Sequence, residues 1–487
     1  MMLRKQESKE TSFLRSALMA DGLLIPTDEF LDWFKSRNQA CVSEVCKIPL
    51  SDLEDWYFSD CPRRLVHQSG KFFTVGGIKV KTTFGSVPEW DQPIIIQPEV
   101  GILGVITKVV GDVRYFLLQA KMEPGNVNSV QLSPTVQATR SNYTCVHKGK
   151  LPLYLEYFIN RGKAKILVDQ IQSEQGARFF QKVNRNIVVE VETDILIHKN
   201  FCWLTLGQIK QLLLKDNIVN MDLRSVLSCI PFMSADLHRS LGVNFSPESA
   251  RIQIFDQQIT GFSKSLLESM TCKESVCHTL DEIIGWYTEM RSKYYLAVEH
   301  ISLDKVRGWI QTDCDIRQET GQYFSVVGVK VKARDREVGI WSQPLLAASG
   351  HGLVGFLTQK INGVLHFLTC AKMQPGTIGA IEVGPTVTCS HVKERANEAS
   401  APPFLDLFLN ASAENLRYSS IQSEEGGRFY HEQNRYMVIE ISPDSQIDLK
   451  ENYIWMTLRQ VMDLTKHRYF NVEARNLISC LNFSQWI

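Results

Sequence analysis

The sequence predicts an α+β fold that consists of two tandem mixed-sheet domains produced by an internal duplication. Residues 120–136 (AKMEPGNVNSVQLSPTV) match residues 371–387 (AKMQPGTIGAIEVGPTV) at eight of 17 positions, with an offset of 251. Residues 172–191 (QSEQGARFFQKVNRNIVVEV) match residues 422–441 (QSEEGGRFYHEQNRYMVIEI) at ten of 20 positions, with an offset of 250. Because short stacking repeats have periods of about 20 to 50 residues, this period indicates a duplicated domain. Strand-like runs followed by terminal helices in each copy indicate the α+β class.

The repeats set the expected domain boundaries. We expect the first copy at residues 28–230 and the second at residues 280–487, and both lengths lie in the normal range for a domain. Residues 231–279 have no repeat partner and contain Ser, Pro and Gly breakers around a helical patch, SKSLLESM (263–270). This segment is therefore predicted to be a connector between the two domains.

Each copy is expected to contain the same elements in the same order: an amphipathic helix, a strand, a β-hairpin, a polar loop, another strand and two helices. Gly111–Asp112 and Asn362–Gly363 separate β-branched runs and predict the two hairpin turns. Thr205 precedes an apolar 3.6-residue pattern, as a helix cap does. In the first copy the elements are expected at 29–38, 71–82, 101–122, 123–143, 187–191, 203–216 and 222–230.

Composition excludes several classes of function. Lys and Arg equal Asp and Glu at 53 each, which disfavours nucleic-acid or membrane-surface binding. We find no signal peptide and no stretch of about 18 apolar residues, and we expect a soluble cytoplasmic protein. The 12 cysteines form no CxxC pair, and Cys272, Cys277 and His278 fit no zinc spacing. Free thiols and no metal site are therefore expected.

The densest run of polar chemistry is KMEPGNVNSVQLSPTVQATRSNY, residues 121–143. It lacks the periodicity of a core helix and directly follows a hairpin strand that is expected to be buried. Rigid scaffolds that present polar loops are common binding sites, although a solvated surface loop has the same composition. Cations beside many neutral hydrogen-bonding groups suit a polyhydroxylated ligand that bears phosphate.

Several strings in the sequence are similar to those of one enzyme family. QPEVGILGVI, LLQAKMEPGNVNSVQLSPTVQATRSNY, PLYLEYF, QSEQGARFFQKVNRN and FCWLTLGQIKQLL resemble the NDP-hexose 2,3-dehydratases of deoxysugar biosynthesis. The resemblance covers nearly the whole chain, including the duplication. It implies two fused Nudix-like domains in a homodimer, a dTDP-linked 4-keto-6-deoxyhexose as substrate, and functional coupling to a 3-ketoreductase that consumes the product.

Two other functions stay open beside this lyase. A Nudix-type pyrophosphohydrolase would need glutamates that bind Mg²⁺, but the corresponding residues 135–143 contain no acidic side chain. A non-catalytic nucleotide-sugar-binding protein would bind the keto sugar without turning it over. We expect no cofactor, because the 4-keto group of the substrate serves as the electron sink and the chain has neither GxGxxG nor GxxxxGK[ST] after a strand.

Dehydration across C2 and C3 requires a base, an acid and a group that stabilises an oxyanion. The catalytic candidates are Glu156, Tyr143, Arg140 and Lys121. Glu156 lies in the apolar run LYLEYF, where desolvation would raise its pKa, although it also suits the polar side of an edge strand. The expected substrate-binding residues are Glu123, Asn128, Gln131, Ser133, Thr135, Gln137, Thr139, Asn142, Tyr157, Gln175, Arg178, Asn184 and Arg185.

Comparison of the two copies places the expected active site in the first. Shared residues serve the fold or a common nucleotide-binding role, and they include Lys121 with Lys372 and Arg178 with Arg428. The differing pairs are Glu123 and Gln374, Gln137 and Thr388, Arg140 and His391, Glu156 and Asp406, and Tyr157 and Leu407. The first copy alone keeps the full polar set, so the second is expected to be degenerate.

Overall fold

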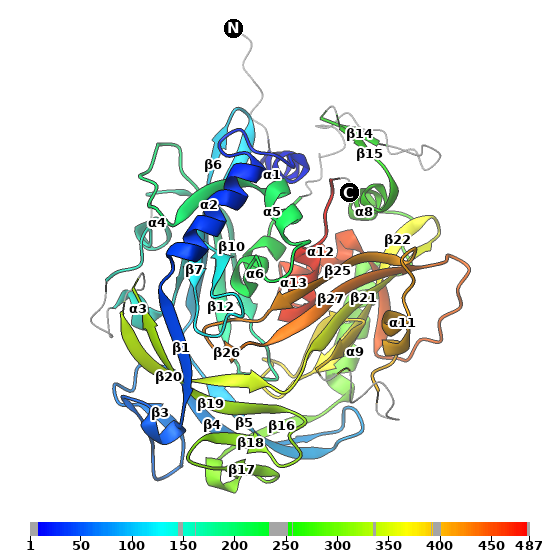
Figure 1. Cartoon of the computed structure of the whole chain (residues 1–487). Coiled ribbons are helices and arrows are strands. Elements are labelled where there is room, and N and C mark those ends of the chain that lie inside the picture. The colour runs from blue at the N-terminus through cyan, green and yellow to red at the C-terminus, as the bar shows by residue number, and fades with distance from the viewer. Residues whose placement is uncertain are drawn as a thin grey trace.

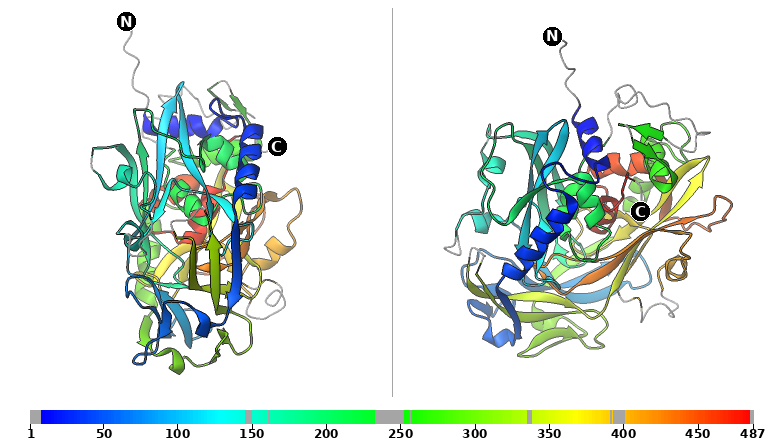
Figure 2. Two further views of the ribbon diagram at one scale, coloured as in Figure 1. Left: turned by 60° about the vertical axis from the view of Figure 1, so that its left-hand side comes forward. Right: turned by 45° about the horizontal axis from the view of Figure 1, so that its top comes forward.

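In the computed structural model, two large sheets flank a central group of helices, and two smaller sheets lie together at the other end of the molecule (Figures 1 and 2). This arrangement confirms the expected α+β class and the tandem duplication. None of the described helices is long and apolar enough to cross a membrane. The structure describes residues 8–144, 150–160, 162–232, 252–255, 257–334, 338–390, 392 and 401–484.

Each copy contributes one seven-stranded mixed sheet. The first has the order β10-β12-β6-β7-β13, with β8 paired to β7 and β9 to β6, and the second repeats this pattern. The hairpin turns are confirmed, because Asp112 and Asn362 adopt φ of 67° and 52° between their strands. The strands of the first sheet are β6 (Gly101–Val110), β7 (Val113–Met122), β8 (Val130–Ser133), β9 (Val136–Ala138), β10 (Lys165–Ser173), β12 (Val183–Glu190) and β13 (Phe201–Thr205). Those of the second are β21 (Gly352–Ile361), β22 (Val364–Met373), β23 (Ile381–Pro385), β24 (Val387–Cys389), β25 (Leu416–Ser423), β27 (Gln433–Ile441) and β28 (Tyr453–Thr457).

The two six-stranded sheets exchange a strand between the copies. Strand β1 of the first copy pairs antiparallel with β19 of the second, from Ser43 opposite Ala333 to Ile48 opposite Gly328. Strand β16 of the second copy pairs in the same way with β4 of the first. The strands are β1 (Ser43–Ile48), β2 (Trp56–Phe58), β3 (Leu65–His67), β4 (Thr74–Thr82), β5 (Glu89–Ile96), β11 (Phe179–Phe180), β16 (Leu296–Ile301), β17 (Trp309–Gln311), β18 (Asp315–Gln318), β19 (Phe324–Ala333), β20 (Ile340–Ala348) and β26 (Phe429–Tyr430). A separate hairpin joins β14 (Ile252–Ile254) and β15 (Gln257–Ile259).

The helices follow the duplication closely. Thr205 begins α5 with a capping box, as predicted, because its hydroxyl accepts a hydrogen bond from the Gln208 amide and Gln208 Oε1 accepts one from the Thr205 amide. Thr457 does the same for α12. The helices are α1 (Lys9–Leu18), α2 (Thr27–Ala40), α3 (Arg140–Tyr143), α4 (Glu156–Ile159), α5 (Leu206–Leu212), α6 (Met221–Ser228), α8 (Gly261–Thr271), α9 (Leu280–Lys293), α11 (Leu405–Leu409), α12 (Leu458–Thr465) and α13 (Val472–Ser479), with short 3-10 turns at Leu50–Asp52 and Leu303–Lys305.

Helix α8 lies in the segment expected to be a connector, yet it packs on the second copy as α1 packs on the first. Ser16 Oγ donates to the Arg114 carbonyl and accepts from the Leu206 amide, at 2.5 and 2.9 Å. Ser269 Oγ makes the matching bonds to Leu365 and Leu458, at 2.5 and 2.8 Å. The structural repeat therefore extends to residues that show no repeat in sequence.

Two buried arginines hold the copies together at the centre. Helices α6 and α13 pack against each other there, between the large sheets (Figure 1). Arg224 on α6 donates to Gln422 Oε1 at 2.9 Å and to the Ser423 carbonyl at 2.6 Å in the second copy. Arg475 on α13 donates in return to the Ser173 carbonyl at 2.5 Å. Both side chains are fully buried, so these bonds are shielded from water.

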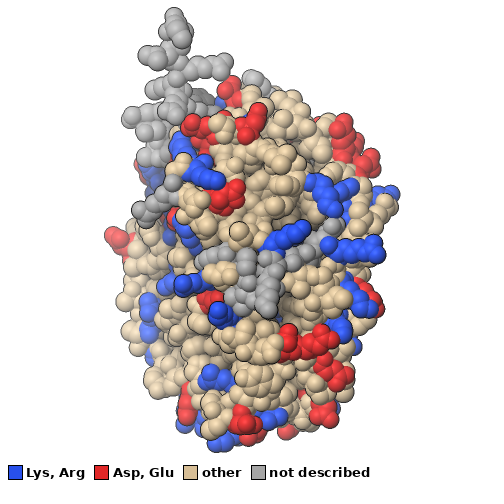
Figure 3. Space-filling view, turned by 90° about the vertical axis from the view of Figure 1, so that its left-hand side faces the viewer, with Lys and Arg blue, Asp and Glu red and all other residues tan. Residues whose placement is uncertain are grey.

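The main hydrophobic core is also shared between the copies. One buried cluster contains Phe116 and Val188 of the first large sheet together with Phe356 and Val438 of the second. Outside the core, basic and acidic side chains are interspersed over the face in Figure 3. Cys229 and Cys480, which occupy equivalent positions of the two copies, are both buried, at 3 % and 0 % exposure.

Replacement of Arg224 tests the contact between the copies. Arg224→Met would leave the acceptors on Gln422 and Ser423 buried without a donor, and it is expected to lower the free energy of unfolding by about 3 kcal/mol. Arg317→Met removes an exposed ion pair and is expected to change it by less than about 1 kcal/mol. Urea unfolding monitored by circular dichroism measures both. Equal midpoints for the two variants would contradict the central role of Arg224.

A pH-dependent contact lies at the same boundary between the copies. Ser173 Oγ donates to Glu382 Oε1 at 2.5 Å, whereas the mirror-related pair is Ser423 with the neutral Gln131. Burial raises the pKa of Glu382 to about 7. In the folded state Glu382 therefore keeps its proton at pH values where the unfolded chain has already lost it. This proton binding stabilises the folded state at low pH, and the stabilisation is lost as the pH rises toward 7.

Glu382→Gln is expected to remove this dependence, because the amide copies the mirror-related Gln131. Between pH 5 and pH 8 the difference in unfolding free energy between variant and parent should shift in favour of the variant by roughly 1–3 kcal/mol. Urea titrations at both pH values measure this shift. A difference that does not change with pH would show that Glu382 is ionised throughout.

Candidate active site

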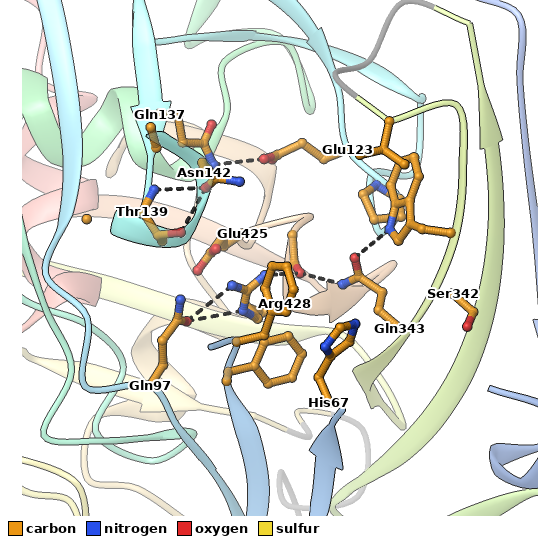
Figure 4. A pocket seen from close by; sticks show the side chains of 18 of the residues that line it. His67, Gln97, Glu123, Gln137, Thr139, Asn142, Ser342, Gln343, Glu425 and Arg428 are labelled. Carbon is orange, nitrogen blue, oxygen red and sulfur yellow. Dashed lines mark hydrogen bonds between the residues drawn. The ribbon is translucent and has the colours of Figure 1, made fainter. Parts of the chain in front are cut away.

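A cavity of about 530 Å³ lies in the first copy and is completed by the second. It lies between the large sheet of the first copy, the β2–β3 region and strand β20 of the second copy (Figure 4). Its lining includes Lys121, Glu123, Gln137, Thr139, Asn142, Lys182, Asn184 and Asp222 from the first large sheet and its flanks, Trp56, His67, Phe72, Phe73 and Gln97 from the first small sheet, and Trp341, Gln343, Glu425 and Arg428 from the second copy.

Glu123 follows the end of β7 and points toward Gln137 (Figure 4). It is 4 % exposed, and its Oε1 accepts a hydrogen bond from Gln137 Nε2 at 2.8 Å and lies 3.5 Å from Lys121 Nζ. The second oxygen, Oε2, is buried and has no hydrogen-bond partner among the described residues. A cation and an amide donor stabilise the carboxylate, while Oε2 has an unused capacity to accept a hydrogen bond.

Two other lining carboxyl groups have raised pKa values. Burial raises the pKa of Asp222, at the start of α6, well above its ordinary value, and the charges of Glu425 and Glu123 raise it further. Burial also raises the pKa of Glu425, against the opposing effect of Arg428. Burial of Asp222 therefore favours its protonated form, which is the form that can donate a proton.

Glu174 lies beside the cavity rather than in its lining. Its Oε1 accepts a hydrogen bond at 2.7 Å from Nδ2 of Asn184, which lines the cavity. Burial raises the pKa of Glu174 to about 7, and the charge of Glu425 adds to this effect. We call Glu123, Glu174, Asp222 and Glu425 the carboxyl cluster.

Three cations accompany the carboxyl cluster. Lys121 lies beside Glu123, and Lys182 Nζ donates to the Glu99 carbonyl. Burial lowers the pKa of Lys182, while the charge of Glu174 opposes this shift. Arg428 Nε and Nη2 both donate to Gln97 Oε1, at 3.3 and 3.2 Å. The cavity therefore offers acids, bases and cations within one buried space.

Aromatic rings form the opposite side of the cavity, which we call the aromatic wall: Trp56, His67, Phe72 and Phe73. Successive ring centroids are 5.0 Å apart for Phe73 and Trp56, 5.3 Å for Trp56 and His67, and 4.6 Å for His67 and Phe72. Trp56 Nε1 donates to the carbonyl of Ser342 in the second copy at 3.1 Å, which fixes the wall against β20.

The Pro-Gly sequence after each hairpin permits the copies to approach closely. The Gly125 amide donates to the Gly426 carbonyl at 2.7 Å, and its carbonyl accepts from the His431 amide at 2.8 Å. A Cβ atom at Gly125 would lie 1.6 Å from the Phe429 carbonyl oxygen, so only glycine fits. Gly376 has the mirror-related environment against Phe179. This contact brings residues 425–428 of the second copy into the cavity of the first.

The structure brings some of the sequence-predicted residues together and separates others. Lys121, Glu123, Gln137, Thr139, Asn142 and Asn184 line the cavity. The side chain of Tyr143 lies outside the described part of the chain, as does His391. Arg140 is exposed, and Glu156 and Tyr157 are half-buried on α4 rather than on an edge strand; none of the three lines the cavity.

The remaining predicted residues have other contacts. Thr135 donates to the Leu117 carbonyl and Ser133 to the Pro134 carbonyl, both inside the first copy. Arg185 forms an ion pair with Asp169 at 2.6 Å. The others lie at boundaries with the second copy or its flanking loops: Asn128 and Gln131 bond each other, Gln175 donates to Glu424 Oε2 at 2.6 Å, and Arg178 covers the ring of Phe324.

Sequence reasoning missed Lys182, Asp222, Glu425, Arg428 and the aromatic wall as cavity residues. A signal was present in the difference between the copies, because Lys182 aligns with Glu432 and Glu425 aligns with Gln175. Because Glu425 of the second copy lines the cavity of the first, its difference from Gln175 can be interpreted only when it is known which cavity it lines.

The corresponding residues of the second copy have different chemistry. Gln374 replaces Glu123 and donates at 3.3 Å to Glu473, the counterpart of Asp222. Glu432 replaces Lys182, and Thr388 replaces Gln137. The second copy therefore lacks the charged carboxylate and one of the cations that the first copy presents.

Comparisons with known proteins agree with this duplicated arrangement. A model of the NDP-hexose 2,3-dehydratase family matches residues 27–230 and 280–481. A dTDP-4-dehydro-6-deoxy-alpha-D-glucopyranose 2,3-dehydratase of Saccharopolyspora spinosa is 44 % identical over 97 % of this chain and 95 % of its own length. Proteins of the same name from Amycolatopsis orientalis and Streptomyces violaceoruber are 42 % and 39 % identical, over 96 % and 93 % of this chain and 92 % and 97 % of their own lengths. The chain belongs to the NDP-hexose 2,3-dehydratase family.

Proposed function

We propose that the chain dehydrates a dTDP-linked 4-keto-6-deoxyhexose across C2 and C3, to give a 3,4-diketo-2,6-dideoxyhexose. The names of the relatives support the substrate class. The observation that carries the proposal is that Glu123 and Asp222 line one cavity. Glu123 Oε2 is buried without a hydrogen-bond partner among the described residues, and burial of Asp222 favours its protonated form.

The reaction follows from the acidity of the substrate. The C3 hydrogen is α to the C4 carbonyl, so a base can remove it while the electron pair moves to the C4 oxygen. Collapse of this enolate breaks the C2–O bond, and a proton from an acid converts the departing hydroxyl to water. The resulting enol at C3 takes up a proton at C2 and becomes the second ketone, with no net oxidation.

The residues of the cavity fit these roles. Glu123 is proposed as the base, since Lys121 and Gln137 stabilise its carboxylate and Oε2 accepts no hydrogen bond from the described residues. Asp222 is proposed as the acid that protonates the leaving hydroxyl, because burial raises its pKa and so favours the protonated form. Lys121 is proposed to stabilise the negative charge on the C4 oxygen, as a cation in a buried site does effectively.

The setting of the enzyme is part of the proposal. The diketo product is chemically labile, so we propose that a 3-ketoreductase consumes it directly. We also propose that the chain acts as a homodimer in the cytoplasm and needs neither a metal nor a nicotinamide for its own step, because the substrate carries the required electron sink.

Glu123→Gln tests whether Glu123 is the base. The substitution introduces the same side chain that the second copy has at the equivalent position, Gln374. Turnover is expected to fall by about two orders of magnitude or more, because an amide cannot accept the C3 proton. The assay couples the product to a 3-ketoreductase and measures NADPH oxidation. Asp406→Asn, on α11 of the second copy, is the control and should stay within a few-fold of the parent. Equal losses in both variants would remove Glu123 from the mechanism.

Hydrogen exchange tests where the reaction begins. In deuterated water the enzyme is expected to introduce deuterium at C3 of recovered substrate if proton removal is reversible, and Glu123→Gln should slow this exchange by about two orders of magnitude. Mass spectrometry and NMR locate the label. The 4-hydroxy analogue should bind without reacting, because it has no ketone. Dehydration of that analogue at a comparable rate would show that the ketone is not the electron sink.

A further inference from the structure

The cavity is lined by aromatic rings on one side and by carboxyl groups on the other, with a cation between them. The aromatic wall forms one side, and the carboxyl cluster lies around Glu123 and Asp222. Arg428 lies between them, because its guanidinium is 4.3 Å from the centre of the Phe73 ring and its charge acts on Glu425. Figure 4 shows Arg428 and Glu425 at the centre, with Glu123 and His67 on different sides of them.

The four rings of the aromatic wall all line the cavity, but they differ in how accessible they are. Phe73 and Trp56 are 3 % and 9 % exposed, and Arg428 covers Phe73. His67 and Phe72 also line the cavity but are only half-buried, so they present more accessible surface than Phe73 and Trp56 do. Burial lowers the pKa of His67, which favours the neutral imidazole, an uncharged aromatic ring.

Arg428 is held in place by neutral acceptors. Its Nε and Nη2 donate to Gln97 Oε1, and its Nη1 donates to the Gly427 carbonyl at 2.7 Å. A guanidinium has five N–H groups, so these three bonds leave two that make no hydrogen bond to the described residues. A fixed guanidinium with remaining donors suits a phosphate group.

We infer that His67 and Phe72 form the nucleobase subsite, and that Arg428 of the second copy binds the pyrophosphate of the same ligand. The inference rests on the proposed function, since it assigns the three parts of a nucleotide sugar to three parts of one cavity. The order of aromatic wall, cation and carboxyl cluster matches the order of base, pyrophosphate and sugar. A volume of about 530 Å³ lies within the range of small-molecule sites.

Binding of thymidine diphosphate and of inorganic pyrophosphate separates the two subsites. Phe72→Leu and His67→Leu keep apolar bulk but remove a ring, and each is expected to weaken thymidine diphosphate binding by about 5- to 100-fold. The same variants should leave pyrophosphate binding within about two-fold, because the phosphate contacts stay. Arg428→Met should weaken both ligands by about 10-fold or more, as expected for loss of charged hydrogen bonds. Isothermal titration calorimetry measures all three.

Matched variants keep the test decisive. Tyr323→Leu changes the second-copy counterpart of Phe72 and should leave the KM for the keto sugar unchanged, whereas Phe72→Leu should raise that KM with little change in kcat. Phe72→Tyr retains a ring and should restore binding. Arg428→Lys replaces Arg428→Met if the latter does not fold, and should weaken pyrophosphate binding because the planar fork is lost.

Two results would overturn the inference: unchanged thymidine diphosphate binding in both ring variants, or equal loss of pyrophosphate and thymidine diphosphate in them. These outcomes are distinct from a failure of the proposed function. A chain that binds thymidine diphosphate through the ring residues but does not dehydrate the keto sugar would refute only the function. A chain that dehydrates the sugar while the ring variants bind normally would refute only the subsites.

Discussion

Strand β1 leaves the first copy to complete a sheet of the second, and strand β16 makes the reverse connection. Neither small sheet is therefore complete with residues of one copy. The paired arginines Arg224 and Arg475 add buried hydrogen bonds between the large halves, and the hydrophobic core continues across the same boundary. The cavity lies at this boundary, because its aromatic wall belongs to the first copy and strand β20 to the second.

The exchange also explains how one duplicated sequence can hold one specialised cavity. Glu425 and Arg428 belong to the second copy but line the cavity of the first. A substitution in either copy can therefore alter a site on the other side of the boundary. The resulting difference is chemical rather than architectural, since Glu123 and Gln374 occupy matching positions after matching strands, and an amide takes the place of the carboxylate.

Much of the fold could be predicted because it is encoded in local pattern. The hairpins at Gly111–Asp112 and Asn362–Gly363 and the cap at Thr205 are confirmed. The partner of β1 could not be predicted, since its sequence suits the edge of either copy's sheet. Residues 121–143 have the composition of a loop, yet they include β8, β9 and α3, because their polar groups find partners inside the protein. Lys121 and Glu123 could be selected from this run as site residues. Arg428 could not be assigned to the site from the sequence, because it belongs to the second copy but lines the cavity of the first.

A crystal structure of the protein with the unreactive 4-hydroxy analogue of the dTDP-linked sugar tests most directly whether both copies build one active site. We expect C3 of the sugar to lie within hydrogen-bond distance of the Glu123 carboxylate, with Asp222 beside the C2 hydroxyl and Arg428 of the second copy on the pyrophosphate. A ligand held in the cavity by residues of the first copy alone would contradict the account. A sugar ring placed away from Glu123 and Asp222 would contradict it as well.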